Sequence, residues 1–287
     1  MDAVRELNYL PNVHARRLVS GRSGTIGFVA PVLSDPFFPE CIEGVEMAAR
    51  DAGLTLLLAT SSHDEHRQGE VLPSLEGPHF DGVVSVPVGD VARLHPFLDR
   101  RLPIVCIDTE VDHPNAACVL SDLDRGTRLA VERLIGRGCR HLVMLDNVEE
   151  PDDRRRRRDA FIEAVPDDIE RHVIEAPWTM DGGRVAAERL LAQHPAADGV
   201  FADYDVMAMG AMEVLRRAGR SIPDDIAIVG CDDIEFAAAA APPLTTIRID
   251  RARIGREAVA RLLDLLSGAE GIEPTVVPTT LTRRETD

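Results

Sequence analysis

The sequence contains no lysine, because all 32 of its basic residues other than histidine are arginine. Aromatic residues make up only 4% of the chain, with one tryptophan, Trp178. No apolar run approaches the roughly 18–20 residues that a membrane-spanning helix needs. These shortages exclude a phosphate loop built around lysine and predict that the chain does not cross a membrane.

The motifs that mark common enzyme classes are also missing. There is no Gly-x-Gly-x-x-Gly turn and no nucleophile elbow. His63 and His66 are three residues apart, but no acidic or histidine partner completes a metal-ligand set. We therefore expect no catalytic residue, no cofactor and no metal site.

The spacing of the cysteines does not indicate a disulfide framework. The five lie far apart, at positions 41, 106, 118, 139 and 231, and their odd number argues against full disulfide pairing. The N-terminus shows no secretory signal, since charged residues precede any apolar stretch. A reducing, cytoplasmic location is predicted.

Charge divides the chain unevenly. The formal net charge of −17 opposes contact with nucleic acid over most of the surface. Residues 1–24 differ, because they carry four arginines and one histidine against Asp2 and Glu6. Any affinity for phosphates is expected to lie in that segment.

From residue 25 onward, short apolar runs alternate with amphipathic stretches. This rhythm predicts an α/β protein whose strands are mostly parallel and joined by right-handed helical crossovers. The strands are expected at 25–32, 54–59, 82–86, 103–107, 142–145, 171–175, 199–202, 226–229 and 275–282, and the last segment is interpreted as one strand.

The most informative stretch is 226–233 (IAIVGCDD), followed by 242–247 (PPLTTI). Its uninterrupted apolar run predicts a strand buried on both faces. Asp232 and Asp233 come just beyond the carboxyl end of that strand, where parallel sheets bind ligands. Each aspartate could instead cap the next helix.

These strings resemble the "VGFDD…PPLTT" pattern of the LacI/GalR (lactose-repressor) family of bacterial transcription regulators. Residues 8–18 (NYLPNVHARRL) resemble the family junction "GYxPNxxAR.L", in which a hinge helix enters the DNA minor groove. The resemblance assigns DNA-hinge roles to four residues, Asn12, Ala15, Arg16 and Leu18. A helix-turn-helix head would have to precede this hinge before the chain could recognise an operator.

The resemblance also implies the fold, which is two doubly wound parallel-sheet lobes of the type I periplasmic-binding-protein kind, joined by three crossovers. Residues 1–24 would then be the end of a DNA-binding head plus the hinge helix. The N-terminal lobe would take 25–120 and 248–278, and the C-terminal lobe 121–247 and 279–287.

The same resemblance nominates the ligand-binding residues, which are Phe37, Phe38, Ser85, Asp108, Arg157, Trp178, Tyr204 and Asp232. Carboxylates accept hydrogen bonds from sugar hydroxyls or purine N–H groups, and a guanidinium can hold two oxygens. For the aromatic residues, core packing is the competing interpretation. Five consecutive arginines, 154–158, leave the register open by one position. Tyr204 stands where the family commonly has asparagine, and Asp205 is predicted to cap the following helix.

The predicted function is a ligand-responsive repressor. A small polar effector, most simply a sugar and alternatively a purine, would bind between the lobes, and lobe closure would control operator binding by a homodimer. The alternative is a solute-binding protein of a sugar transporter, which shares the fold but requires a secretion signal.

Overall fold

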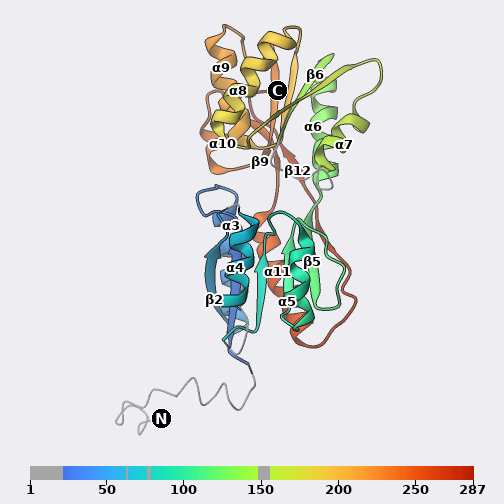
Figure 1. Cartoon of the computed structure of the whole chain (residues 1–287). Helices are drawn as coiled ribbons and strands as arrows, with labels where there is room; N and C mark the ends of the chain where they lie inside the picture. The colour runs from blue at the N-terminus through green and yellow to red at the C-terminus, as the bar shows by residue number, and fades with distance from the viewer. Residues whose placement is uncertain (1–21, 63, 76–78, 148–155) are drawn as a thin grey trace, which may run out of the picture. The chain divides into compact units, whose positions relative to one another are not determined.

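The chain folds around two six-stranded sheets, each flanked by helices (Figure 1). The computed structural model describes residues 22–62, 64–75, 79–147 and 156–287. The predicted hinge residues Asn12, Ala15, Arg16 and Leu18 lie outside the described residues, as does His63.

The first sheet has the strand order β11-β5-β4-β3-β1-β2. Its registered pairs β1–β2, β1–β3, β3–β4 and β5–β11 are all parallel. The strands are β1 (Thr25–Ala30), β2 (Thr55–Thr60), β3 (Gly82–Ser85), β4 (Ile104–Ile107), β5 (Ala116–Ser121) and β11 (Thr275–Val277).

The second sheet has the order β12-β10-β9-β8-β6-β7. It is parallel from β10 to β7, and only β12 pairs antiparallel, with β10. The strands are β6 (His141–Asn147), β7 (Glu170–Ala176), β8 (Gly199–Ala202), β9 (Ala227–Asp232), β10 (Thr245–Arg248) and β12 (Thr280–Thr282).

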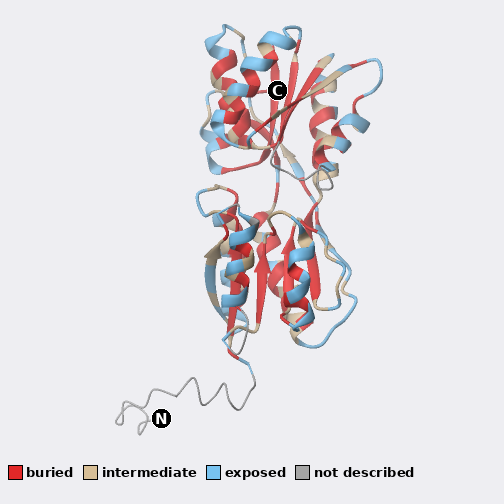
Figure 2. Cartoon of the chain, in the orientation of Figure 1, coloured by how far each residue is buried: buried red, intermediate tan, exposed pale blue. Residues whose placement is uncertain are grey.

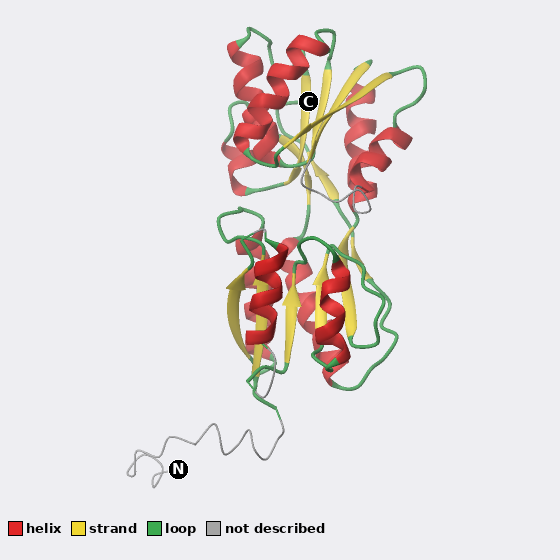
Figure 3. Ribbon diagram, in the orientation of Figure 1, coloured by secondary structure: helices red, strands yellow, loops and turns green. Residues whose placement is uncertain are grey.

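Helices cover both faces of the second sheet, with α8 and α9 on one side and α6 and α7 on the other (Figure 3). This arrangement confirms the predicted α/β class with mostly parallel sheets. The described helices are α3 (Phe38–Asp51), α4 (Glu65–Ser74), the 3-10 turn η1 (Val91–Leu94), α5 (His95–Asp99), α6 (Leu123–Arg137), α7 (Arg156–Ala164), α8 (Met180–Gln193), α9 (Asp205–Arg217), α10 (Glu235–Ala239) and α11 (Arg251–Leu266).

The prediction of a single strand over 275–282 was wrong. The segment splits into β11, which pairs with β5 in the first sheet, and β12, which pairs with β10 in the second. Pro278 falls at the break, and proline has no N–H to donate to a strand ladder. The next residue, Thr279, is buried and donates its hydroxyl to the Asp122 carbonyl at 2.8 Å.

The core of the second sheet is apolar and closely packed. Strands β8 and β9 are buried along their whole length, and buried residues line the inner faces of the helices (Figure 2). Helices α8 and α9 meet through glycines, because a Cβ on Gly210 would lie 2.0 Å from the Met180 carbonyl oxygen. This contact fixes the position of α9, whose first turn follows the carboxyl end of β8.

The chain divides into two compact units. The first contains the described residues up to Leu33 together with Ile42–Cys118 and Gly255–Pro274. The second contains Ser34–Cys41, Val119–Ile254 and Thr275–Asp287. The short 34–41 segment therefore belongs with the second unit, although it lies in sequence between β1 and the body of α3.

Candidate effector site

Polar residues gather at the carboxyl ends of strands in the second unit. Asp203 directly follows β8, and Asp232 is the last residue of β9. These strands are neighbours in a parallel sheet, so their ends share one edge. Both aspartates are buried, Asp203 completely. A buried carboxylate is costly unless it is paired or hydrogen-bonded, which makes this edge a candidate site.

Arg157 provides the positive charge at this edge. It lies in the first turn of α7 and is only 5% exposed, whereas Arg156 is exposed and the Arg158 side chain forms an ion pair with Glu175. The Arg157 Nε lies 2.7 Å from the Asp203 carboxylate, and its Nη1 donates to the Asp203 carbonyl at 3.1 Å. Among the described arginines of the run, Arg157 is therefore the one that is buried at the site.

Two aromatic side chains lie beside Arg157. Its Nη2 donates to the Tyr204 hydroxyl at 3.0 Å, and its guanidinium carbon lies 4.7 Å from the centre of the Tyr204 ring. The Trp178 ring is 5.9 Å from that of Tyr204. Both aromatics are partly buried against the apolar core, so core packing accounts for part of each ring while the rest remains exposed.

The turn that follows β9 has unusual backbone geometry. Asp232 and Asp233 adopt positive φ angles of 115° and 55°, conformations that non-glycine residues rarely take. Such strain persists only where the surroundings enforce it. Here the Arg251 guanidinium donates to the carbonyls of Asp232 (2.6 Å) and Asp233 (3.0 Å), while the Thr246 hydroxyl accepts from the Asp233 amide (3.3 Å).

The Asp233 carboxylate is also fully engaged. It accepts hydrogen bonds from Arg284 at 2.5 Å, Arg248 at 3.1 Å and the Thr282 hydroxyl at 3.2 Å. Burial alone would raise the pKa of Asp233, but these donors lower it below the ordinary value. Asp233 therefore joins β9 to β10 and β12 rather than presenting itself to a ligand.

The Asp232 carboxylate takes no part in this network, although the residue is only 5% exposed. Within the described chain, no residue donates a hydrogen bond to its carboxylate. Burial raises the pKa of Asp232 well above its ordinary value, and the neighbouring charges of Asp205 and Asp35 add to the effect. The side chain is thus a buried acceptor whose backbone is held in place and whose carboxylate lacks a donor.

Asp205 does not have the predicted role of a helix cap. Helix α9 begins at Asp205 after Tyr204, and no side chain caps it. The Asp205 carboxylate instead accepts from the Ile234 amide at 3.0 Å and the Thr246 hydroxyl at 2.5 Å. The cap prediction failed because the partners of Asp205 come from strands and turns that are distant in sequence.

The remaining predicted ligand residues are Ser85 and Asp108 in the first unit and Phe37 and Phe38 in the second. In the first unit, Ser85 ends β3 completely buried, and its hydroxyl has no hydrogen-bond partner among the described residues. Asp108 follows β4 with a positive φ of 52°. Phe37 and Phe38 belong with the second unit and pack edge to face, with ring centres 5.4 Å apart. Their contact with a ligand remains a prediction.

The sequence interpretation identified Arg157, Trp178, Tyr204 and Asp232, which the structure places at or beside one edge of the second sheet. It gave no role to four of the residues that hold them, which are Asp203, Thr246, Arg251 and Arg284. It singled out Asp205 and Asp233, but as a helix cap and as a possible ligand-facing or capping residue. A single sequence gave no signal for these contacts, because most of them join segments more than ten residues apart. In the described ranges, no group of three histidine, cysteine or acidic side chains is arranged to hold a metal ion.

Comparison with known proteins gives consistent matches. A family profile described as a periplasmic binding protein-like domain matches residues 131–286. The chain is 33% identical over 252 residues to the ribose operon repressor of Halalkalibacterium halodurans, covering 86% of this chain and 74% of that protein. It is also 33% identical to the HTH-type transcriptional regulator CelR of Thermobifida fusca, covering 99% and 87%.

A solved structure of a CelR–cellobiose complex matches the fold with a TM-score of 0.81 and 30% identity, covering all of this chain and 89% of that one.

Among the described helices, none is long and apolar enough to span a bilayer.

Proposed function

Because the chain belongs to the LacI/GalR family of transcriptional regulators, we propose that its second unit binds a neutral sugar or sugar-like effector that controls attachment of a dimer to operator DNA. The observation that carries the proposal is the buried Asp232 carboxylate, which has no donor among the described residues. Two adjacent sugar hydroxyls would supply the donors that it lacks.

The surroundings of Asp232 favour a neutral effector over an anionic one. The Arg157 charge is already matched by Asp203, so it cannot fully compensate a phosphate. The Asp232 carboxylate would repel an anion at close range. The aromatic pair Trp178 and Tyr204 offers a face against which the C–H groups of a sugar can pack.

In the first unit, Ser85 and Asp108 lie at the carboxyl ends of their strands, where parallel sheets bind ligands. An effector that binds one of two conformations of the protein more tightly than the other increases the population of the first. That shift in population would then reach the hinge around residues 12–18 and alter operator binding. This coupling is testable by operator binding of a protein that carries a helix-turn-helix head, with and without the effector.

The direct test is a thermal unfolding screen with cellobiose, ribose, lactose, sugar phosphates and purines. A ligand present at about 100 times its dissociation constant adds roughly 2.7 kcal/mol to the stability of the folded state. For a protein of this size, we expect the melting temperature to rise by at least roughly 2 °C with a neutral sugar. A rise confined to sugar phosphates would contradict the neutral-effector assignment, and a rise confined to purines would replace the sugar by a base.

We also propose that the dimer uses the free edge of the first sheet. Strand β2 is the last strand in the order, and Leu57 and Leu58 are each 48% exposed on it. Sedimentation is expected to give the mass of two chains, and replacing both leucines by aspartate is expected to give the mass of one. A double variant that still sediments as a dimer would place the interface elsewhere.

A further inference from the structure

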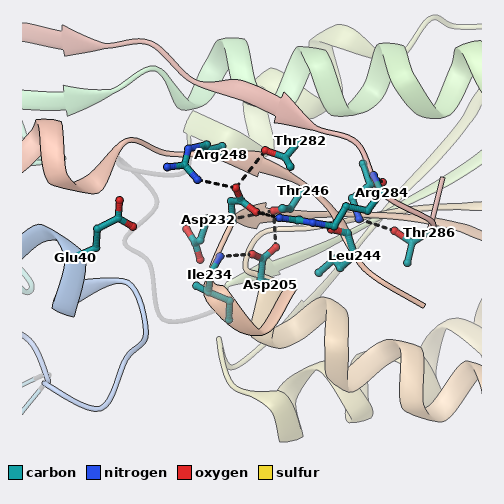
Figure 4. A network of polar contacts seen from close by, with 12 residues as sticks. Glu40, Asp205, Asp232, Ile234, Leu244, Thr246, Arg248, Thr282, Arg284 and Thr286 are labelled. Carbon is teal, nitrogen blue, oxygen red and sulfur yellow. Dashed lines mark hydrogen bonds and ion pairs between the residues drawn. The ribbon is translucent and has the colours of Figure 1, made fainter. Parts of the chain in front are cut away.

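The Asp205 carboxylate lies where three parts of the second unit meet. Asp205 is the first residue of α9. Its carboxylate accepts hydrogen bonds from the Thr246 hydroxyl on β10 and from the Ile234 amide in the turn after β9 (Figure 4). Strand β9 makes room for it with Gly230, since a Cβ there would lie 2.2 Å from the Asp205 Oδ1 atom. Asp205 is completely buried, so solvent does not compete for these hydrogen bonds.

The hydrogen bonds around Asp205 all lead from donors in the turn to its carboxylate, which is the final acceptor. The Asp233 amide donates to the Thr246 hydroxyl, and that hydroxyl donates its only proton to Asp205. The Ile234 amide donates to the other carboxylate oxygen. Two consecutive amides of the turn are thus held, directly or through Thr246, by one carboxylate. An amide side chain at position 205 would place an NH2 group opposite one of these donors.

We propose that Asp205, acting through Thr246, is a positioning residue that fixes the strained turn after β9 so that Asp232 faces the effector. The inference rests on the proposed function, because Asp232 is taken as the effector's acceptor. Asp205 itself does not touch the effector. The anchored atoms are the amides of Asp233 and Ile234, the two residues that follow Asp232.

The charge on Asp205 has a further consequence. Burial raises the pKa of Asp205 to about 7, although the hydrogen bonds from Thr246 and Ile234 oppose this rise. The charged groups near it are Asp233 and Arg251, and the charge of Asp205 in turn raises the pKa of Asp232, which also feels Asp35, Arg157 and Arg251. Removing the charge at position 205 is therefore expected to lower the pKa of Asp232.

The test compares matched threonine variants on β10. Thr246→Val removes the hydroxyl that joins Asp205 to the turn, whereas Thr246→Ser keeps it. Thr245→Val is the control, because Thr245 is also buried and its hydroxyl donates to Asp287 and accepts from the Arg284 amide, but makes no hydrogen bond to residues 232–234. Binding of cellobiose and of ribose is followed by Trp178 fluorescence, with Trp178 being the only tryptophan in the chain.

We expect Thr246→Val to weaken sugar binding by roughly tenfold, and Thr246→Ser and Thr245→Val to change it by less than about threefold. A tenfold change corresponds to about 1.4 kcal/mol. Equal losses in the two valine variants, or wild-type affinity in Thr246→Val, would overturn the positioning role. The proposed function would survive that result as long as substitution of Asp232 still removed binding.

Two further measurements distinguish the positioning role of Asp205 from a general loss of structure. In Asp205→Asn, the pH midpoint of sugar affinity is expected to move to lower pH, together with a lower affinity at high pH. An unchanged midpoint would contradict the electrostatic part of the proposal.

The second readout needs no effector. Hydrogen–deuterium exchange over residues 228–240 of the free protein is expected to accelerate in Thr246→Val but not in Thr245→Val. Protection equal to wild type in Thr246→Val would overturn the inference even if sugar binding failed for another reason. If the wild-type protein bound neither sugar while this exchange difference was present, the proposed effector class would be wrong and the anchoring of the turn would stand.

Discussion

Asp232→Asn is expected to abolish measurable sugar binding while leaving the protein folded. Asparagine replaces one carboxylate oxygen by an NH2 donor and leaves the other as a neutral acceptor. Because hydrogen bonds to a charged group contribute roughly 1.5–3 kcal/mol each, the change is expected to cost about 3 kcal/mol of binding free energy. That loss corresponds to at least roughly a 100-fold increase in Kd. Titration of Trp178 fluorescence with the sugar that stabilises the wild-type protein measures it directly.

The same substitution is expected to have the opposite effect on stability. The pKa of Asp232 is raised above its unfolded-state value, chiefly by burial. The stabilising contribution of such a group is complete below the unfolded-state pKa and is lost as pH rises through the folded-state pKa. Above that pH the wild-type protein buries a costly charge, so Asp232→Asn should unfold at an equal or higher urea concentration.

Asp224→Asn is the matched control for this pair of measurements. The Asp224 side chain is 86% exposed, and its ion pair with Arg137 is long, at 3.8 Å. Neither binding nor stability should change in that variant by more than a few tenths of a kcal/mol. Sugar binding that survives in Asp232→Asn would remove Asp232 from the effector site, whatever the urea curve showed.

Effector affinity is also expected to depend on pH through Asp232. An ionised carboxylate accepts hydrogen bonds from hydroxyls, and the bound sugar would therefore favour ionisation. Affinity should rise with pH and fall as pH drops through the raised pKa of Asp232. Isothermal titration across pH 5–9 measures this dependence, and a flat profile would mean that Asp232 does not change protonation state in the range where binding occurs.

Local pattern was sufficient to predict most of the strands and several site residues, but β5 (Ala116–Ser121) and β10 (Thr245–Arg248) were not among the predicted strands. The buried run before Gly230 predicted β9, and its end predicted the position of Asp232, because apolar continuity and parallel topology are visible within a few residues. The cap of α6 is also of this local kind, since Asp122 accepts from the Arg125 amide, which is only three residues away.

Predictions failed where the deciding partner was distant in sequence. Asp205 looked like a cap because it opens a helix, yet its partners Thr246 and Ile234 lie 41 and 29 residues away. A single sequence does not show that Gly230 leaves space for that carboxylate. The break at Pro278 was readable in principle, because proline interrupts a strand ladder, and the lobe boundary implied by the family resemblance falls at the same place, between residues 278 and 279.

Arg157→Ala is expected to destabilise the second unit more than any other single change at the site. Arg157 is 5% exposed and Asp203 is fully buried, so the variant leaves a buried carboxylate without its cation. Breaking a buried pair in this way costs roughly 3–5 kcal/mol. Urea unfolding followed by Trp178 fluorescence reports on this region, because Trp178 packs against the same core as Tyr204.

A double substitution separates the cost of an unpaired charge from the loss of packing. Arg157→Met with Asp203→Asn removes both charges and keeps most of the side-chain volume, so it should recover most of the stability that Arg157→Ala loses. Replacing both members of a buried ion pair is often neutral, whereas removing one is not. If the double variant were as unstable as Arg157→Ala, packing and the hydrogen bond to Tyr204 would matter more than the ion pair. Recovery of stability without recovery of sugar binding would instead assign Arg157 a direct role in holding the effector.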